Sequence, residues 1–118
     1  MDQPETKLQR KIVKELNKLP LTYFEKNHGS PMGKPKLDLT GSVYGICVHL
    51  EVKMPGKKPT DRQWGTIRYW RSRGAVADWV TSVDEAMDVI NPILEKGDRI
   101  QDVLNSTSRA HLVGRKTD

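Results

Sequence analysis

The chain has 118 residues, of which 36% are hydrophobic and 30% are charged. This length suffices for one compact domain but not for two independent ones, and the composition excludes a disordered chain that lacks a core. The positive charge is uneven, because residues 1–59 hold 11 Lys and Arg against 6 Asp and Glu, while the second half is neutral. A basic field of this kind favours a polyanion such as nucleic acid, although a solvated lysine-rich surface explains the charge equally well.

The sequence also excludes several classes of protein. Its single cysteine, Cys47, rules out an intramolecular disulfide, and no Cys/His cluster has the spacing of a zinc site. No apolar run reaches the ~20 residues needed to span a bilayer, and Met1–Arg10 is polar rather than typical of a signal peptide. We therefore expect a cytoplasmic, intracellular protein that does not associate with membranes.

The first secondary-structure elements are predicted from the spacing of apolar residues and from the positions of proline and glycine. Residues Glu5–Leu19 carry an apolar stripe at helical spacing, and Pro20 ends the run, which predicts an amphipathic helix. Leu21–Lys26 is typical of a short strand. The following segment, Asn27–Pro35, is rich in glycine and proline and predicts a loop.

Two further strands are predicted after this loop. Lys36–Thr40 and Ile46–Met54 are β-like runs, and the five residues Gly41–Gly45 between them predict the connection of a hairpin.

The second half of the chain alternates helix, strand and helix. The Thr-x-x-Gln pattern at Thr60 predicts a helix that ends at Gly74, and the same kind of capping pattern at Ser82 predicts another helix that Pro92 kinks or ends. The remaining elements are a strand, a weaker helix and a loose polar tail, predicted at Ala75–Val80, at Asp98–Leu104 and from Ser106 onward. We expect a catalytic domain over residues 1–97, with a C-terminal helix and basic tail over residues 98–118.

One strand carries the residues of chemical interest. Along residues 46–53 apolar side chains alternate with polar ones, so that Glu51 and Lys53 project from the same face. If the hairpin pairs Thr40 with His49, the same register places Asp38 beside Glu51. Neighbouring carboxylates on paired strands are destabilising unless a cation, a nearby lysine or another register relieves them.

Such a cluster suits metal-assisted hydrolysis. Oxygen ligands on Asp38 and Glu51 are those that Mg²⁺ or Mn²⁺ prefers, and hydrolysis of a phosphodiester needs both an activated water and a positive counter-charge. Lys53 supplies a point charge that can orient the water and stabilise developing negative charge.

The segments around these residues resemble a known family. Lys36–Gly41, Leu50–Lys57 with its Glu-x-Lys, and Gln63 are similar to the VRR-NUC branch of the PD-(D/E)XK nucleases. The likeness also takes in Glu5-x-x-x-Gln9, Gly74 and Ser82–Ala86, so that it covers about Glu5 to Ile90. One departure is that the usual Pro-Asp pair is Leu37-Asp38 here, with Pro35 displaced toward the loop.

The resemblance implies an α/β fold of the restriction-endonuclease-like type, with a mixed β-sheet flanked by helices. It implies Asp38, Glu51 and the backbone carbonyl of Val52 as metal ligands, with Glu5 as a further candidate ligand. Lys53 is implied as the catalytic lysine, and Gln63 and Glu5 have supporting roles. It further implies a Mg²⁺- or Mn²⁺-dependent DNA endonuclease that leaves 5′-phosphate and 3′-hydroxyl ends. Resemblance to stand-alone members of phage or bacterial type further implies a homodimer, with branched DNA such as Holliday junctions as the substrate.

Each supporting residue also has an ordinary structural explanation. A carboxylate at Glu5 is favoured by the helix dipole whatever its function, and Gln63 is the reciprocal partner of the Thr60 cap. We interpret His28 and His49 as surface or packing residues, because no second histidine stands at ligand spacing. The tryptophans are expected in the core or in an interface rather than stacked on bases.

Four lysines flank the proposed site in the sequence, and we expect them to bind the phosphate backbone: Lys34, Lys36, Lys57 and Lys58.

Two alternatives to the nuclease stay open at this point. One is a nucleic-acid-binding module of the same fold without activity, and the other is a basic protein-interaction domain.

Overall fold

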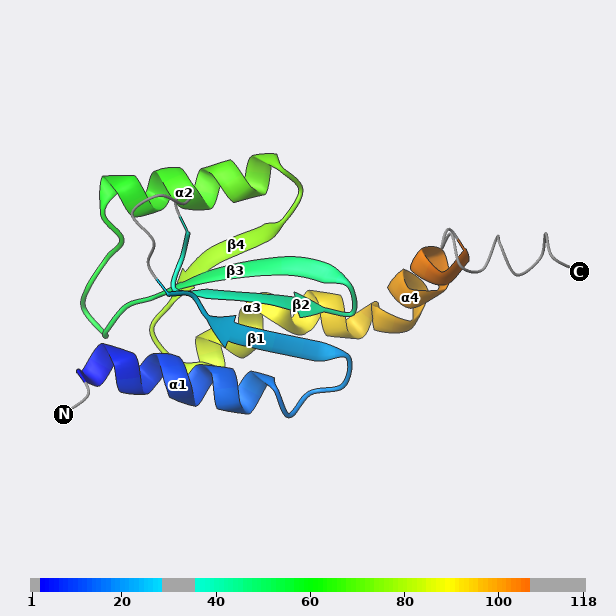
Figure 1. Ribbon diagram of the computed structural model, residues 1–118, viewed down its shortest axis with the longest axis horizontal. Helices are drawn as coiled ribbons and strands as arrows, with labels where there is room; N and C mark the ends of the chain where they lie inside the picture. Colours follow the sequence, from blue (N-terminus) through cyan, green and yellow to red (C-terminus); the bar gives the residue numbers. More distant parts are fainter. Residues whose placement is uncertain (1–2, 29–35, 107–118) are drawn as a thin grey trace, which may run out of the picture.

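A four-stranded mixed sheet forms the framework of the molecule in a computed structural model that describes residues 3–28 and 36–106 (Figure 1). The strands lie in the order of the chain, and their bounds are β1 Thr22–Lys26, β2 Leu39–Val43, β3 Ile46–Val52 and β4 Val76–Val80. β1, β2 and β3 pair antiparallel, whereas β4 pairs parallel to β3. The parallel pair requires a crossover, which α2 provides. The predicted mixed α/β architecture is confirmed.

Two helices cover one face of the sheet. α1 (Pro4–Leu16) and α3 (Val83–Glu95) lie side by side on that face (Figure 1). Both are amphipathic and bury their apolar stripes against the strands. The resulting main core is lined by residues without solvent exposure, among them Ile12, Leu16, Val48, Leu50, Val52, Val80 and Ile90.

The opposite face carries one helix and a second, smaller core. α2 (Asp61–Ser72) lies over β3 and β4 on this face. Leu37, Ile67 and Ala77 are buried beneath it, and three half-buried aromatic side chains pack around them: Trp64, Trp70 and Trp79. This placement agrees with the predicted packing role of the tryptophans.

The hairpin between β2 and β3 is tighter than predicted. β2 extends through Val43, so that only Tyr44 and Gly45 connect the strands instead of five residues. Their φ angles of 50° and 90° are those of a type I′ turn, whose twist matches that of the flanking strands. The prediction was wrong because Gly41 and Ser42 suggested a loop, whereas they pair with Val48 and Cys47.

The helix ends also differ from prediction. α1 ends at Leu16 because the Asn17 side chain binds the backbone of Phe24, accepting from its N–H at 2.7 Å and donating to its carbonyl at 3.1 Å. α3 continues through Pro92, which is exposed, and ends only at Glu95.

The predicted C-terminal helix is present and slightly longer. α4 (Gly97–Ser106) extends away from the sheet at its hairpin end (Figure 1). Gln101 donates to the carbonyl of Tyr44 at 3.0 Å, which ties its first turns to the hairpin. The domain division after residue 97 stays a prediction, and most of the predicted tail lies outside the described residues. Over the ranges that the structure describes, no helix has the length and apolar character to cross a membrane.

Candidate active site

Two carboxylates meet at the end of the sheet where β3 finishes. Thr40 pairs with His49 and Leu39 pairs with Leu50, so the predicted register is confirmed. In this register Asp38, the residue before β2, lies opposite Glu51. The backbone N–H of Asp38 donates to Oε1 of Glu51 at 3.2 Å. The backbone N–H of Val52 donates to Oδ2 of Asp38 at 2.9 Å. Each carboxylate is therefore held by the backbone of the other strand.

Gln63 connects this pair to the start of α2. Its Nε2 donates to Oε2 of Glu51 at 2.8 Å, while its Oε1 accepts from the backbone N–H of Thr60 at 2.9 Å. The Thr60 hydroxyl accepts in return from the N–H of Gln63 at 3.2 Å, which completes the capping box. The two interpretations of Gln63 are thus compatible, because one amide caps the helix and orients Glu51.

Lys53 supplies the positive charge of the cluster. Its Nζ lies 3.8 Å from Oε2 of Glu51, and both side chains are largely buried, with exposed fractions of 14% and 5%. The backbone N–H of Lys53 donates to the carbonyl of Val80 at 2.9 Å, which extends the pairing of β3 with β4. The parallel pair therefore fixes the backbone of Lys53 beside the carboxylates.

Burial dominates the electrostatics of the site. The pKa of Glu51 is raised to about 8, first because burial penalises the charged carboxylate and then because Asp38 adds a like charge. Lys53 acts in the opposite direction. The positive charge of Lys53 therefore does not offset the combined effect of burial and of the second acid.

The donor set fits a hard divalent cation held by few protein ligands. Within residues 3–28 and 36–106, no three His, Cys, Asp or Glu side chains gather closely enough to hold a metal together. Asp38 and Glu51 nevertheless offer adjacent carboxylates, and the peptide of Val52 lies against Asp38. Mg²⁺ commonly uses one or two carboxylates and keeps several waters, so this pair is sufficient.

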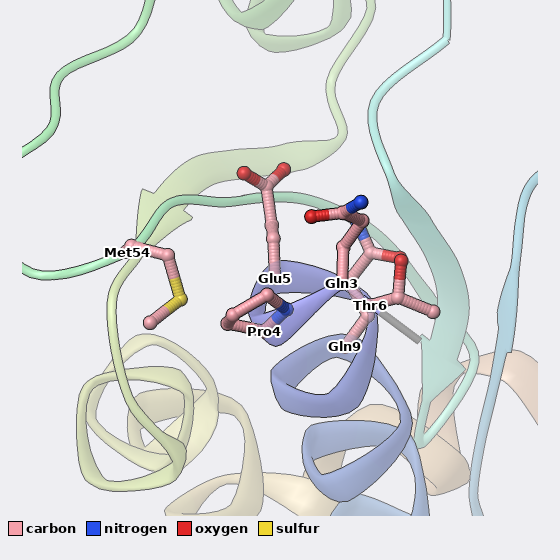
Figure 2. A pocket seen from close by; sticks show the side chains of 6 residues that line it. All are labelled: Gln3, Pro4, Glu5, Thr6, Gln9 and Met54. Atoms are coloured by element: carbon pink, nitrogen blue, oxygen red, sulfur yellow. The ribbon is translucent and has the colours of Figure 1, made fainter. Parts of the chain in front are cut away.

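Glu5 lies apart from this pair. It lines a hollow at the N-terminal end of α1 together with Met54, which follows Lys53 directly (Figure 2). No hydrogen bond or ion pair joins Glu5 to Asp38, Glu51 or Lys53. The N-terminal end of α1, which carries Glu5 in its first turn, lies at the end of the sheet where β3 finishes (Figure 1), without a bond from Glu5 to the carboxylate pair.

A polar network adjoins the site, and no sequence pattern predicted it. Nδ2 of Asn27 donates to the carbonyl of Leu37 at 2.7 Å and to the hydroxyl of Thr40 at 2.5 Å, and its backbone N–H donates to the carbonyl of Asp38 at 2.8 Å. Asn27 therefore fixes the backbone on both sides of the Leu37–Asp38 peptide. The strand alternation placed Thr40 on the face of Asp38, but no spacing indicated Asn27.

His49 belongs to this network and not to a metal site. Its ring lies 3.2 Å from the Thr40 hydroxyl and 3.2 Å from the Cys47 sulfur, and it stacks on Trp70 at 4.0 Å between ring centroids. Burial lowers the pKa of His49, which favours the neutral ring. His28 is exposed. The packing interpretation of His49 agrees with these contacts.

Three of the four predicted phosphate-binding lysines are exposed in segments next to the site residues in the chain. Lys36 is exposed and precedes Asp38 by two residues, and Lys57 and Lys58 are exposed in the segment between β3 and α2. Lys34 lies outside the described residues. The accessible ammonium groups of these three lysines are compatible with phosphate contacts.

The arrangement of the chain has a counterpart among solved structures. It superimposes on a chain described as "VRR_NUC domain" with a TM-score of 0.59 at 22% sequence identity, and the match covers 77% of this chain and 94% of that one. No protein-family model and no curated protein matches the sequence. The chain therefore has the fold of a VRR_NUC domain, as the sequence resemblance implied.

Proposed function

We propose that this chain is a nuclease that hydrolyses phosphodiester bonds of DNA with the help of Mg²⁺ or Mn²⁺. The observation that carries the proposal is the convergence of four side chains, from the start of β2, the end of β3 and the first turn of α2, on one end of the sheet: Asp38, Glu51, Lys53 and Gln63. A mere solvated polar face would not bury Glu51 to 4% exposure. Burial of ionisable groups at such cost is typical of functional sites.

The two carboxylates act as the cation ligands in this proposal. Asp38 and Glu51, with the carbonyl of Val52, would hold the ion. When bound, the cation supplies Lewis acidity and lowers the pKa of a coordinated water. The backbone N–H groups that donate to both carboxylates keep their oxygens oriented, so that binding requires little rearrangement.

Lys53 and Gln63 have separate tasks in the reaction. The ammonium group of Lys53 orients the attacking water and stabilises the negative charge that develops on the phosphate. Gln63 is a positioning residue, since it acts through Oε2 of Glu51. Attack of water on phosphorus with release of the 3′ oxygen gives the 5′-phosphate and 3′-hydroxyl ends. Exposed Lys36, Lys57 and Lys58 bind flanking phosphates.

Cleavage of both strands of a duplex or branch calls for two sites in fixed relation, and we therefore propose a two-fold homodimer acting on branched DNA such as four-way junctions. The apolar residues of α4 supply candidates for the interface, because Val103 and Leu104 are 57% and 41% exposed. Light scattering is expected to report about twice the chain mass of 13.4 kDa, and a strict monomer that makes paired cuts in a junction would exclude the dimer.

Cleavage assays test the proposed reaction. The purified protein is incubated with plasmid and four-way-junction DNA in Mg²⁺, Mn²⁺ or EDTA. We expect cutting in either metal and none in EDTA. Asp38→Asn and Glu51→Gln are expected to retain the fold by circular dichroism and to lose cleavage. Wild-type rates in either variant would remove these residues from the site, and cutting in EDTA would exclude the metal.

A further inference from the structure

The two carboxylates of the site differ in how the sheet holds their backbone. Glu51 lies within β3 and pairs with Trp79 of β4, whereas β2 begins only at Leu39, one residue after Asp38. The paired residues of the sheet thus include Glu51 but end one residue short of Asp38. A ligand that is not held in place must be ordered when its partner binds, and this ordering costs affinity. The position of Asp38 therefore depends on further contacts.

Two groups of Asn27, the residue directly after β1, bind the backbone around Asp38. The backbone N–H of Asn27 donates to the carbonyl of Asp38 at 2.8 Å, and its side-chain Nδ2 donates to the carbonyl of Leu37 at 2.7 Å. The carbonyl of Leu37 and the N–H of Asp38 belong to the same planar peptide. The bond from Nδ2 therefore fixes the orientation of this peptide and the direction in which the N–H of Asp38 points.

The same peptide is connected to both carboxylates of the site. Its N–H donates to Oε1 of Glu51 at 3.2 Å, and the Asp38 side chain that follows it accepts at Oδ2 from the N–H of Val52 at 2.9 Å. A rotation of the peptide would break the first bond and move Asp38 away from the second. Within the described residues, no hydrogen bond joins Asn27 to either carboxylate side chain, so it acts on them through this peptide.

The amide of Asn27 is itself held in place. Nδ2 carries two hydrogens, and it donates to the hydroxyl of Thr40 as well as to the carbonyl of Leu37. That hydroxyl lies 3.2 Å from Nδ1 of His49, whose ring stacks on Trp70 of α2. The amide cannot turn away from Leu37 without losing both bonds, so its orientation is determined by contacts with two strands.

We propose that Asn27 is a positioning residue of the active site, whose side chain orders the Leu37–Asp38 peptide so that Asp38 and Glu51 bind the cation without prior rearrangement. The inference rests on the proposed function and deepens it. Loss of a partner that orients a metal ligand commonly lowers metal affinity or activity about 10–100-fold. A residue that only stabilises the fold would instead affect the melting temperature and leave metal affinity unchanged.

Metal binding without DNA tests the role of the amide. Asn27→Ala removes Nδ2 but keeps the backbone N–H that donates to Asp38, and the dissociation constant for Mn²⁺, measured by isothermal titration calorimetry, is expected to rise about 10–100-fold. Asn27→Ser is a second variant with the same expectation, in case the alanine variant does not fold.

Asn17→Ala is the matched control. The side chain of Asn17 likewise binds the backbone of another segment, through the N–H and the carbonyl of Phe24 on β1. The control is expected to lower the melting temperature as Asn27→Ala does, because each variant loses two hydrogen bonds of a side-chain amide. Its dissociation constant for Mn²⁺ should equal that of wild type.

Amide hydrogen exchange in EDTA examines the peptide without metal or DNA. The N–H of Asp38, which donates to Glu51, is expected to lose protection in Asn27→Ala and to keep it in Asn17→Ala. Thr40→Val removes the bond to the hydroxyl but not the bond to Leu37, so its dissociation constant for Mn²⁺ should rise less than that of Asn27→Ala. An equal rise would mean that metal affinity does not depend on the orientation of this peptide, which contradicts the proposal.

Three further results would overturn the inference: an unchanged Mn²⁺ constant in the Asn27 variants, an equal rise in Asn17→Ala, or unchanged exchange of the Asp38 N–H. If one of them is found while wild type binds Mn²⁺ and cuts DNA, the nuclease proposal stands without a role for the Asn27 side chain. If wild type neither binds Mn²⁺ nor cuts DNA, the proposed function falls, and the inference falls with it.

Discussion

The two faces of strand β3 carry side chains of opposite chemistry. Toward α1 and α3, β3 directs Val48, Leu50 and Val52, all without solvent exposure, into an apolar core. Toward α2 the same strand directs His49 and Glu51, which are almost equally buried but polar. Burial of the apolar side chains stabilises the fold, whereas burial of the polar side chains on the other face costs free energy.

The comparison shows how a small domain accommodates a buried charged site. The apolar face stabilises the strands through contacts that need no exact orientation, whereas the two polar side chains that β3 directs to the other face have defined partners, Gln63 for Glu51 and Thr40 for His49. Stability and chemistry can therefore be changed separately by substitutions only one residue apart.

The largest effect on stability is expected on the apolar face. Leu50→Ala removes a completely buried side chain from the main core and should lower the free energy of unfolding by roughly 2–5 kcal/mol. Urea denaturation followed by circular dichroism measures the change. A loss below about 1 kcal/mol would mean that the two faces do not differ in this way.

The neighbouring face should respond in activity instead. Lys53→Ala is expected to lower the cleavage rate about 10²–10³-fold, as removal of one electrostatic donor does, while the urea midpoint changes little. Metal-induced thermal shifts should persist, because the lysine is not a ligand. Full activity in this variant would show that the ammonium group has no part in the reaction.

A pH dependence of stability is also expected in the metal-free protein. The pKa of Glu51 is about 8 in the folded state against an ordinary 4.5, so the folded state binds more protons between these values. Its contribution is fully present below pH 4.5 and is lost as pH rises through 8, at no more than ~1.4 kcal/mol per pH unit. Glu51→Gln should remove this slope, measured by urea denaturation in EDTA. Identical slopes in wild type and in Glu51→Gln would contradict the assignment of this pH dependence to Glu51.

The local pattern was enough to predict the core of the site. The alternation in residues 46–53 and the pairing of Thr40 with His49 together placed Asp38 beside Glu51, because a strand allows only two faces and one register buries the apolar side. The capping pattern at Thr60 also predicted the position of Gln63, because a capping box depends only on residues close together in the sequence.

What the sequence did not predict depends on distant neighbours. Gly41 suggested a turn, but it lies within β2 because the ring of Phe24 on β1 occupies the space of its missing Cβ. Pro92 suggested a helix end, but on the exposed side of α3 it is accommodated. Asn27 acquires its role only when the residue after β1 meets the backbone of residues 37–40.

The placement of the tryptophans gives the molecule an intrinsic optical probe. All three indoles of the chain pack in the small core beneath α2, and the main core contains none. Intrinsic fluorescence therefore reports selectively on the side of the sheet that carries Glu51 and Gln63, whereas far-ultraviolet dichroism reports on the whole backbone. A signal change in one without the other would separate events at α2 from global unfolding, without any label.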